Sequence, residues 1–435
     1  MSPPKTSLAI LGTGISGLAA AYFLARRENY EVTLFEKEDR LGGHAHTVMV
    51  EEEEKVLPID TGFMVYNEVT YPLLTRLFEE LKVVTKPTIM SFSVQHRGDD
   101  LEYNGTSLPL LFVQRRNLLR PRYWRMLGQI ARFHQESVQE LMDPHFREMT
   151  LRDYVNLRGY GEDFLQWYLS PMAAAVWSSS PASIEQFPAH TLLRFWHQHG
   201  FLGRHTHHPW RTVVGGSRAY VEKLVTSLKH RLHQGARLKK MRSHDRGVEL
   251  LFEDGSREHF DKVILAVHGD QALPLLDDPT PLEEEILSAF RYQHNDLYLH
   301  TDPQFMPQRK RAWASWNYRI DGKEKGGGYH YSTHYWMNEL QGVSERENYF
   351  VSLNPPVIPK EDSIKRALCY EHPLFDLKAI AAQERLSELR AAGSRTNRYF
   401  CGAWQRYGFH EDGLLSACWV AQEILGHDPW LSHHQ

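Results

Sequence analysis

A glycine-rich turn near the N-terminus constrains the fold more than any other feature of this sequence. An apolar run at 8–11 leads directly into the turn Gly12-Thr13-Gly14-Ile15-Ser16-Gly17, and a helix-forming stretch follows at 18–27. A second apolar run, 31–35, ends at Glu36, whose carboxylate is placed to accept hydrogen bonds from a ribose diol. Strand, turn, helix and strand in this order predict a dinucleotide-binding unit within a parallel α/β sheet.

Each residue of the turn has a mechanical role in such a unit. Gly12 permits the tight bend, Gly14 lets a pyrophosphate approach the backbone, and Gly17 lets the helix pack closely on the strand. Ile15 and Ser16 lie in the turn just before the helix, whose N-terminus offers free N–H groups and a partial positive charge to phosphates. We therefore expect cofactor contacts along the whole turn.

The residues after Glu36 favour a flavin over a nicotinamide. Arg40-Leu41-Gly42-Gly43-His44 resembles the R-x-G-G element of the flavin amine oxidase and phytoene desaturase superfamily, where this element lies along the diphosphate and ribityl chain of FAD. Asp60-Thr61-Gly62-Phe63 is similar to the strand and turn that approach the isoalloxazine ring. The resemblance implies FAD as the cofactor, with contacts at Lys37, Arg40, Gly42, Gly43, His44, Gly62 and Phe63. His44 stands where relatives often carry Arg or Lys, so it is a candidate for a hydrogen bond to the flavin or for covalent attachment.

Later segments resemble the remaining FAD elements of the superfamily in the right order. A Gly215-Gly216 turn precedes a predicted helix at 218–232, and a buried strand is predicted at 261–267. A strand at 399–403 and a helix at 414–425 follow, and in the superfamily this last helix points its N-terminus at the flavin. This implies further contacts at Gly402, Asp412, Gly413 and Leu414.

We expect an α/β fold with a discontinuous Rossmann-like FAD-binding domain and an inserted α+β substrate domain. The FAD-binding domain is predicted at 1–70, 210–275 and 395–435, and the substrate domain at 71–209 and 276–394. Glu51 to Glu54 are predicted to form the solvated tip of a hairpin.

Composition narrows the partners and the compartment. The net charge of −4 gives no reason to expect nucleic acid, and three cysteines without a C-x-x-C pair fit a reducing compartment. We expect a cytoplasmic protein, with peripheral membrane contact as an option. Membrane contact is suggested by residues 114–132, which include six arginines, no acidic residue and several apolar side chains. This composition is typical of segments that lie on anionic membranes. A core-packed helix with solvated arginines is the alternative.

The sequence leaves the catalytic residue unknown. Tyr66 and His410 are weak candidates for a base, and Trp177 is a candidate for a wall beside the flavin. Trp404, Tyr407, Phe409 and His410 form a second aromatic set, for which ordinary core packing is the alternative. The histidine tract His197, His199, His205, His207 and His208 is predicted to be a surface loop, and no metal is predicted.

A closer resemblance suggests the substrate. Arg40–Thr47, 312–318 and 408–413 are similar to bacterial predicted NAD/FAD-binding, amine-oxidase-like proteins associated with cyclopropane fatty acid synthases. The resemblance implies a lipid acyl chain or another small apolar substrate, oxidised by hydride transfer to flavin, and a lipid methyltransferase as partner. Two alternatives stay open: a flavin amine oxidase, and a flavin-containing scaffold for such a methyltransferase.

Overall fold

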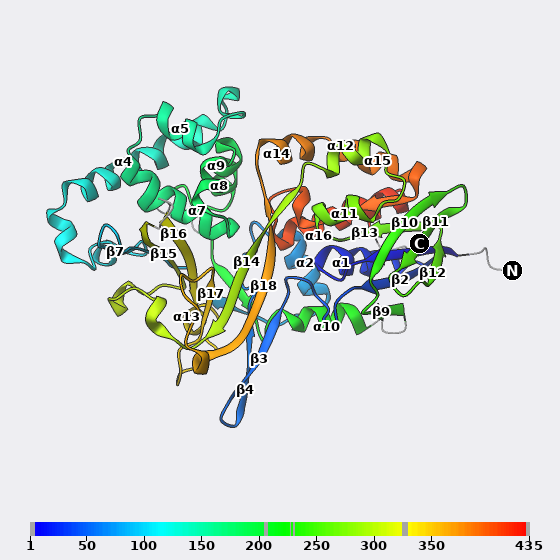
Figure 1. Cartoon of the computed structure of the whole chain (residues 1–435), viewed down its shortest axis with the longest axis horizontal. Coiled ribbons are helices and arrows are strands. Elements are labelled where there is room, and N and C mark those ends of the chain that lie inside the picture. Colours follow the sequence, from blue (N-terminus) through cyan, green and yellow to red (C-terminus); the bar gives the residue numbers. More distant parts are fainter. Residues whose placement is uncertain (1–4, 204–207, 227, 229–230, 324–328, 432–435) are drawn as a thin grey trace.

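The computed structural model places two bodies side by side, and both chain ends lie in the same body (Figure 1). It describes residues 5–203, 208–226, 228, 231–323 and 329–431. Among the described residues, none of the helices combines the length and the apolar character needed to cross a bilayer.

The first body is built on a five-stranded parallel sheet with the order β19-β13-β1-β2-β9. Its strands are β1 (Thr6–Leu11), β2 (Tyr30–Glu36), β9 (Leu232–Gln234), β13 (Lys262–Leu265) and β19 (Arg398–Phe400). Apart from β1 and β2, neighbouring strands come from parts of the chain that are more than a hundred residues apart. This sheet confirms the predicted α/β class with its discontinuous Rossmann-like domain.

Helices on one face of this sheet share one core. They are α1 (Ile15–Leu24), α2 (Pro72–Glu80), α10 (Arg218–Thr226) and α16 (His410–Leu425). The sequence of α1 is apolar on all sides, and the helix is almost wholly buried between the sheet and α16. Helix α10 is shorter than predicted, because the chain enters strand β9 at Leu232.

The opposite face carries a three-stranded antiparallel sheet and four more helices. They are β10 (Leu238–His244), β11 (Gly247–Phe252), β12 (Arg257–Phe260), α11 (Gly269–Leu275), α12 (Pro281–Leu287), α14 (Leu377–Glu384) and α15 (Leu386–Thr396). Residues of α12, α14 and α15 share an apolar cluster with β1 and β2. These helices lie almost entirely within 276–394, the range predicted for the substrate domain, yet they pack on the sheet of the first body. The predicted domain boundaries stay a prediction.

The second body is a seven-stranded mixed sheet covered by helices. The order is β18-β14-β17-β16-β15-β6-β7, with β6 (Phe92–His96), β7 (Leu101–Asn104), β14 (Arg291–His300), β15 (Trp316–Lys323), β16 (Tyr329–Trp336), β17 (Phe350–Leu353) and β18 (Ile364–Leu374). Its helices are α4 (Pro121–Glu140), α5 (Leu151–Leu157), α6 (Glu162–Phe164), α7 (Ser170–Trp177), α8 (Pro181–Glu185) and α9 (Ala189–Gln198). Their apolar sides meet residues of β6, β7 and β15 in one core.

Smaller elements complete the structure. They are β3 (Thr47–Glu52) and β4 (Lys55–Asp60), which form a hairpin, β5 (Thr85–Thr88) and β8 (Trp210–Val213), which pair with each other, and the short helices α3 (Leu108–Leu111) and α13 (Met337–Leu340). The β3–β4 turn at Glu53 and Glu54 is the predicted charged hairpin tip.

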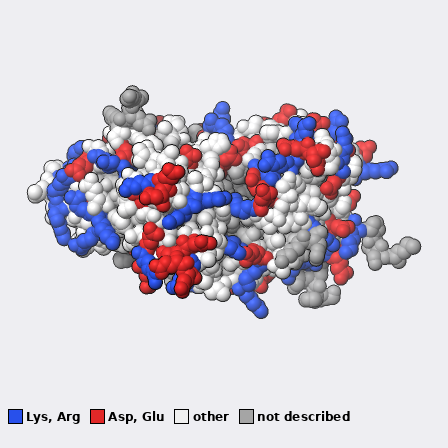
Figure 2. Space-filling model, turned by 60° about the horizontal axis from the view of Figure 1, so that its bottom comes forward, with Lys and Arg blue, Asp and Glu red and all other residues white. Residues whose placement is uncertain are grey.

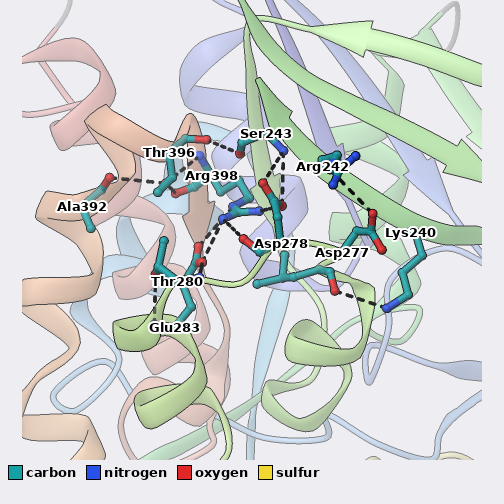
Figure 3. A network of polar contacts seen from close by, with 11 residues as sticks. Lys240, Arg242, Ser243, Asp277, Asp278, Thr280, Glu283, Ala392, Thr396 and Arg398 are labelled. Carbon is teal, nitrogen blue, oxygen red and sulfur yellow. Dashed lines mark hydrogen bonds and ion pairs between the residues drawn. The ribbon is translucent and has the colours of Figure 1, made fainter. Parts of the chain in front are cut away.

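A buried ion network ties β19 to α12 (Figure 3). The Arg398 guanidinium is 1% exposed and contacts the carboxylates of Glu283 at 2.9 Å and Asp278 at 2.6 Å. Glu283 also belongs to the capping box that begins α12 with Thr280. Because Arg398 opens its parallel strand, the network lies at the end of the sheet opposite the glycine turn and serves structure rather than the site.

Candidate functional site

Of the three glycines in the turn after β1, only Gly14 has open space where a side chain would be. Gly12 has φ +99°, and a Cβ added there would lie 2.6 Å from the Ala266 carbonyl oxygen. A Cβ on Gly17 would collide with the Gly12 carbonyl, so both glycines serve close packing. A Cβ on Gly14 would have no neighbour within 4 Å. The space at the start of α1 is where a pyrophosphate can approach the backbone.

Two distant segments close around this turn. A Cβ on Gly43 (φ +58°) would lie 3.0 Å from the Gly14 Cα, which brings the Arg40–His44 stretch against the turn. A Cβ on Gly413 would lie 2.7 Å from Cγ2 of Ile15. The N-termini of α1 and α16 therefore meet, as the sequence resemblance implies for an FAD site.

Glu36 is buried at the end of β2 and is bound to the turn itself. Its Oε2 accepts hydrogen bonds from the Thr13 backbone N–H (2.9 Å) and Oγ1 (2.5 Å), and Oε1 accepts one from the Glu38 N–H (3.1 Å). Lys37 is exposed. The Arg40 guanidinium donates to the Gly43 carbonyl at 2.7 Å, so Arg40 holds the loop in place.

His44 lies at the centre of a group of rings that sequence reasoning did not assemble. Its ring centroid is 5.1 Å from Tyr370, 5.3 Å from His372 and 5.8 Å from His268. Its Nε2 is shielded from solvent and has no partner among the described residues. Burial lowers the pKa of His44 well below its usual range and that of His372 to about 4, so both rings are neutral at pH 7.

Asn295 connects this group to a cavity of about 570 Å³. The Asn295 Nδ2 lies 2.8 Å from Nδ1 of His372, and its Oδ1 accepts from Asn354 Nδ2 at 2.7 Å. Gln293 and Asn295 line the cavity with Tyr331 and Ser179. Asn295 therefore links the lining of the cavity to His372 through a side-chain contact. In the sequence the only signal for these residues is the dense run of polar and aromatic residues in β14 and β18.

Aromatic rings form a wall beside the start of α16. His410 stacks on Phe63 with centroids 3.8 Å apart, and its Nε2 lies 2.9 Å from the Tyr220 hydroxyl. Burial lowers the pKa of His410 to about 3, which leaves the ring neutral. The ring centroids of Phe409 and Trp177 are 6.4 Å apart, so these two rings continue the aromatic wall into the second body.

Other predicted residues lie in the core or serve local structure. Trp404 packs on Phe290 on the far side of the parallel sheet, away from Phe409. The Tyr66 ring is buried against Phe78, and its hydroxyl meets Thr85. The Leu414 side chain lies in the core around α1, and the Gly402 N–H donates to Ser416 Oγ. A Cβ on Gly62 would collide with the His44 carbonyl, so Gly62 fixes the path of the His44 segment.

Two buried carboxylates at the start of α16 are engaged by backbone N–H groups. Glu411 accepts from Leu73 (2.9 Å) and Leu74 (3.0 Å), while Asp412 accepts from Tyr407 and Phe409. Burial raises the pKa of Glu411 to about 7 and that of Asp412 to about 6. The Asp412 carboxylate therefore caps its own turn. Both residues line a second cavity of about 320 Å³, together with Tyr71, His199 and Phe409.

The histidine tract does not assemble a metal site among the described residues. His205 and His207 lie outside the described residues, and His199 stacks on Phe195 at 3.8 Å. In the part of the chain that the structure describes, no group of three His, Cys, Asp or Glu side chains is placed to hold a metal ion.

The parallel sheet, the open glycine turn and the two facing helix N-termini define a dinucleotide-binding oxidoreductase fold. The chain belongs to the flavin containing amine oxidoreductase family, whose model matches residues 15–425. Membership of this family implies FAD as the cofactor, and the space at Gly14 and the unpartnered His44 Nε2 fit a bound FAD.

Two curated plant proteins are similar to part of the chain. The probable polyamine oxidase 4 of Arabidopsis thaliana is 26% identical over 275 residues, which cover 60% of this chain and 50% of that protein. The polyamine oxidase 4 of Oryza sativa subsp. japonica is 27% identical over 277 residues, covering 61% and 51%. The matched region thus spans about half the length of these relatives.

Solved structures share the fold over nearly the whole chain. Wild-type putrescine oxidase bound to putrescine has a TM-score of 0.67 at 14% identity and covers 97% of this chain and 99% of its own. A CLA-producing fatty acid isomerase from P. acnes has a TM-score of 0.63 at 14% identity and covers 97% of both chains. At these identities the likeness concerns the fold alone.

Proposed function

We propose that FAD binds in an extended form across the edge of the parallel sheet. Its ribose would meet Glu36, and its diphosphate the space at Gly14, the Ile15 and Ser16 N–H groups and the Arg40–Gly43 loop. The start of α16 at Gly413 and the His44 and Phe63 rings would face the flavin end. The open space at Gly14 is what supports this placement most directly.

We further propose that the enzyme oxidises or desaturates a lipid acyl chain. The supporting observation is the neutral character of the wall. Phe63, Phe409 and Trp177 carry no charge, and His410 is kept neutral by burial. The nearest carboxylates, Glu411 and Asp412, already accept backbone N–H groups. A hydrocarbon chain loses little on entering such surroundings, whereas a charged group would lose its hydration.

The residues of the chain would bind and orient the substrate rather than react with it. When bound, FAD would supply an acceptor for a hydride from the substrate carbon. The aromatic wall excludes water and presses the chain into position, and the second proton leaves to solvent or to a base. Asn295, which lines the larger cavity and contacts His372, would hold a polar group of the substrate or a water there.

Amine oxidation is the second candidate, and the smaller cavity favours it. Glu411 and Asp412 lie there beside the Tyr71 and Phe409 rings, a combination of acids and aromatic faces that suits an ammonium group. The similarity to polyamine oxidases points the same way. Arg406 also lines this cavity, and its positive charge would repel an ammonium group. For this reason amine oxidation is the second candidate.

Anaerobic flavin reduction tests these proposals. Purified enzyme is mixed with phospholipids that carry unsaturated or methylated acyl chains, or with polyamines, and the loss of oxidised flavin absorbance is recorded. Reduction by lipids supports acyl-chain oxidation, and reduction by amines alone refutes it. If neither substrate reduces the flavin and the protein purifies with a lipid methyltransferase, the scaffold role replaces both proposals.

A further inference from the structure

The tip of the second body combines exposed apolar side chains with arginines. Leu119 is 87% exposed and Leu108 is 68% exposed, and Trp124 and Leu118 are about half exposed. We call these four residues the apolar tip. The Trp124 indole N–H donates to the Leu118 carbonyl at 2.9 Å, and the Trp124 ring packs on Phe112. Trp124 and the chain at Leu118 are therefore held in place by local contacts within the tip.

The fold itself forces these side chains outward. Between α3 and α4 the chain makes a short 3₁₀ turn, Arg115–Leu119, in which the Asn117 side chain alone is buried. Asn117 faces inward toward the Glu102 carbonyl, so Leu118 and Leu119 point the other way. Burying a leucine side chain is favourable relative to leaving it in water. A leucine that is almost fully exposed on an ordered turn therefore has binding energy to gain from a partner.

Arginines encircle the apolar tip. Residues 105–135 contain six arginines and no acidic residue. Figure 2 shows the corresponding left end of the molecule, where Lys and Arg side chains surround uncharged surface. The arginines nearest the tip are Arg115, Arg116, Arg120, Arg122 and Arg125.

Some of these arginines also hold the tip together. Arg116 pairs with Asp100, Arg120 donates to the carbonyls of Asp99 and Asp100, and Arg122 and Arg125 both contact Asp163. Five arginines against three contacting aspartates leave two positive charges in excess. The guanidinium groups of Arg122 and Arg125 remain more than half exposed, so they can reach a further anionic partner.

We propose that this tip docks on an anionic phospholipid bilayer, with Leu119, Leu108 and Trp124 entering the interface and the arginines contacting headgroup phosphates. An apolar projection inside a cationic rim matches the two layers of such a surface, acyl chains beneath and negative headgroups above. Tryptophan and arginine are both suited to that boundary. Nucleic acid would satisfy the arginines but not the exposed leucines. The proposal does not depend on the substrate, because docking needs no turnover.

Vesicle sedimentation with the FAD-loaded, full-length protein tests the proposal. Vesicles of phosphatidylcholine alone are compared with vesicles that contain phosphatidylglycerol. Wild type should sediment with the anionic vesicles at low salt and be released at high salt. Leu119→Glu should weaken this binding roughly tenfold. Arg115→Ala should weaken it about fivefold. Both side chains are exposed, and retained flavin in the supernatant shows that each variant is folded.

The matched control removes three positive charges, more than Arg115→Ala does, from another face of the molecule. Arg242, Arg246 and Arg257 lie exposed on or beside β10 to β12, and their triple replacement by Ala should leave vesicle binding unchanged. The proposal is overturned if wild type fails to sediment with anionic vesicles, or if the Leu119→Glu variant binds as wild type does. It is equally overturned if the control triple loses binding as Arg115→Ala does, or if the protein binds DNA but no vesicle.

Discussion

Gly413 packs so closely on Ser16 that a Cβ added to the glycine would lie 2.9 Å from the serine Oγ. The two residues begin α16 and α1, which are nearly four hundred positions apart in the chain. Two helix N-termini, each with free N–H groups and a partial positive charge, therefore face the same space. We propose that this contact extends the dinucleotide-binding turn into a site for an extended FAD.

Gly413→Ala should separate the two helices and weaken FAD retention. The added Cβ must displace Ile15 or Ser16, and overpacking of this kind costs about 1–3 kcal/mol. The fraction of FAD-loaded protein after gel filtration and the melting temperature should both fall. Gly128→Ala is the control, because its Cβ would meet nothing within 4 Å in the middle of α4. Equal losses in the two variants would contradict the assigned contact.

Glu36→Ala should reduce FAD affinity by about tenfold or more, because the Thr13 N–H and hydroxyl lose their buried acceptor together with the ribose contact. Titration of the apoprotein with FAD, followed by flavin fluorescence, measures the change. Glu31→Ala, an exposed residue on the same strand, should bind FAD as wild type does. Unchanged affinity in Glu36→Ala would show that the ribose lies elsewhere.

Replacing His410 tests whether this residue acts by packing in the aromatic wall or as a general base. Burial keeps His410 neutral, and its Nε2 already meets the Tyr220 hydroxyl, so we expect His410 to act by stacking on Phe63. His410→Phe should keep the rate of substrate-dependent flavin reduction within about tenfold of wild type, and its pH profile should be unchanged. A loss of about a hundredfold or more would instead identify His410 as a general base.

Glu411 should make stability fall as the pH rises. Burial raises the pKa of its carboxyl from the ordinary 4.5 to about 7 in the folded protein. The folded state therefore holds the proton more tightly, and this contribution is complete below pH 4.5 and is lost as the pH rises through 7. Urea denaturation across this range should show Glu411→Gln gaining on wild type by up to about 1.4 kcal/mol per pH unit. Glu423→Gln, exposed on the same helix, should follow wild type.

Arg398→Met should destabilise the fold without touching the cofactor. It leaves the Glu283 carboxylate buried without its partner, which costs about 3–5 kcal/mol. The midpoint of denaturation should fall, while FAD affinity of the folded protein stays unchanged. Arg385→Ala removes the exposed pairs with Glu285 and Glu388, which solvent screens, and should leave stability close to that of wild type. A loss of FAD affinity in Arg398→Met would place the network at the site.

The sequence predicted those parts of the site whose residues lie close together in the chain. The turn at Gly12–Gly17 and the buried acid Glu36 follow one another in the chain, so their spacing reveals the strand-turn-helix unit. The α/β class, the FAD cofactor and the family are confirmed. The individual contact residues stay a prediction.

Long-range contacts could not be predicted in the same way. Nothing near His44 in the sequence shows that Tyr370 and His372 surround it, because β18 reaches that place only through the pairing of β14 with β18. Asn295 has a polar side chain in a strand, a pattern shared by many surface positions. Trp404 and Phe409 are five positions apart and look alike in composition, yet the turn before α16 sends them to opposite sides of the sheet.

The order of the strands also sets when the cofactor can be captured during synthesis. The first strand and its glycine turn are synthesised well before β19 and α16, and β13 pairs with both β1 and β19. A nascent chain that lacks α16 can present only half of the proposed cradle, so stable loading of FAD should wait until α16 has been made. Until then the apolar α1 has no α16 to cover it, and the unfinished chain exposes apolar surface.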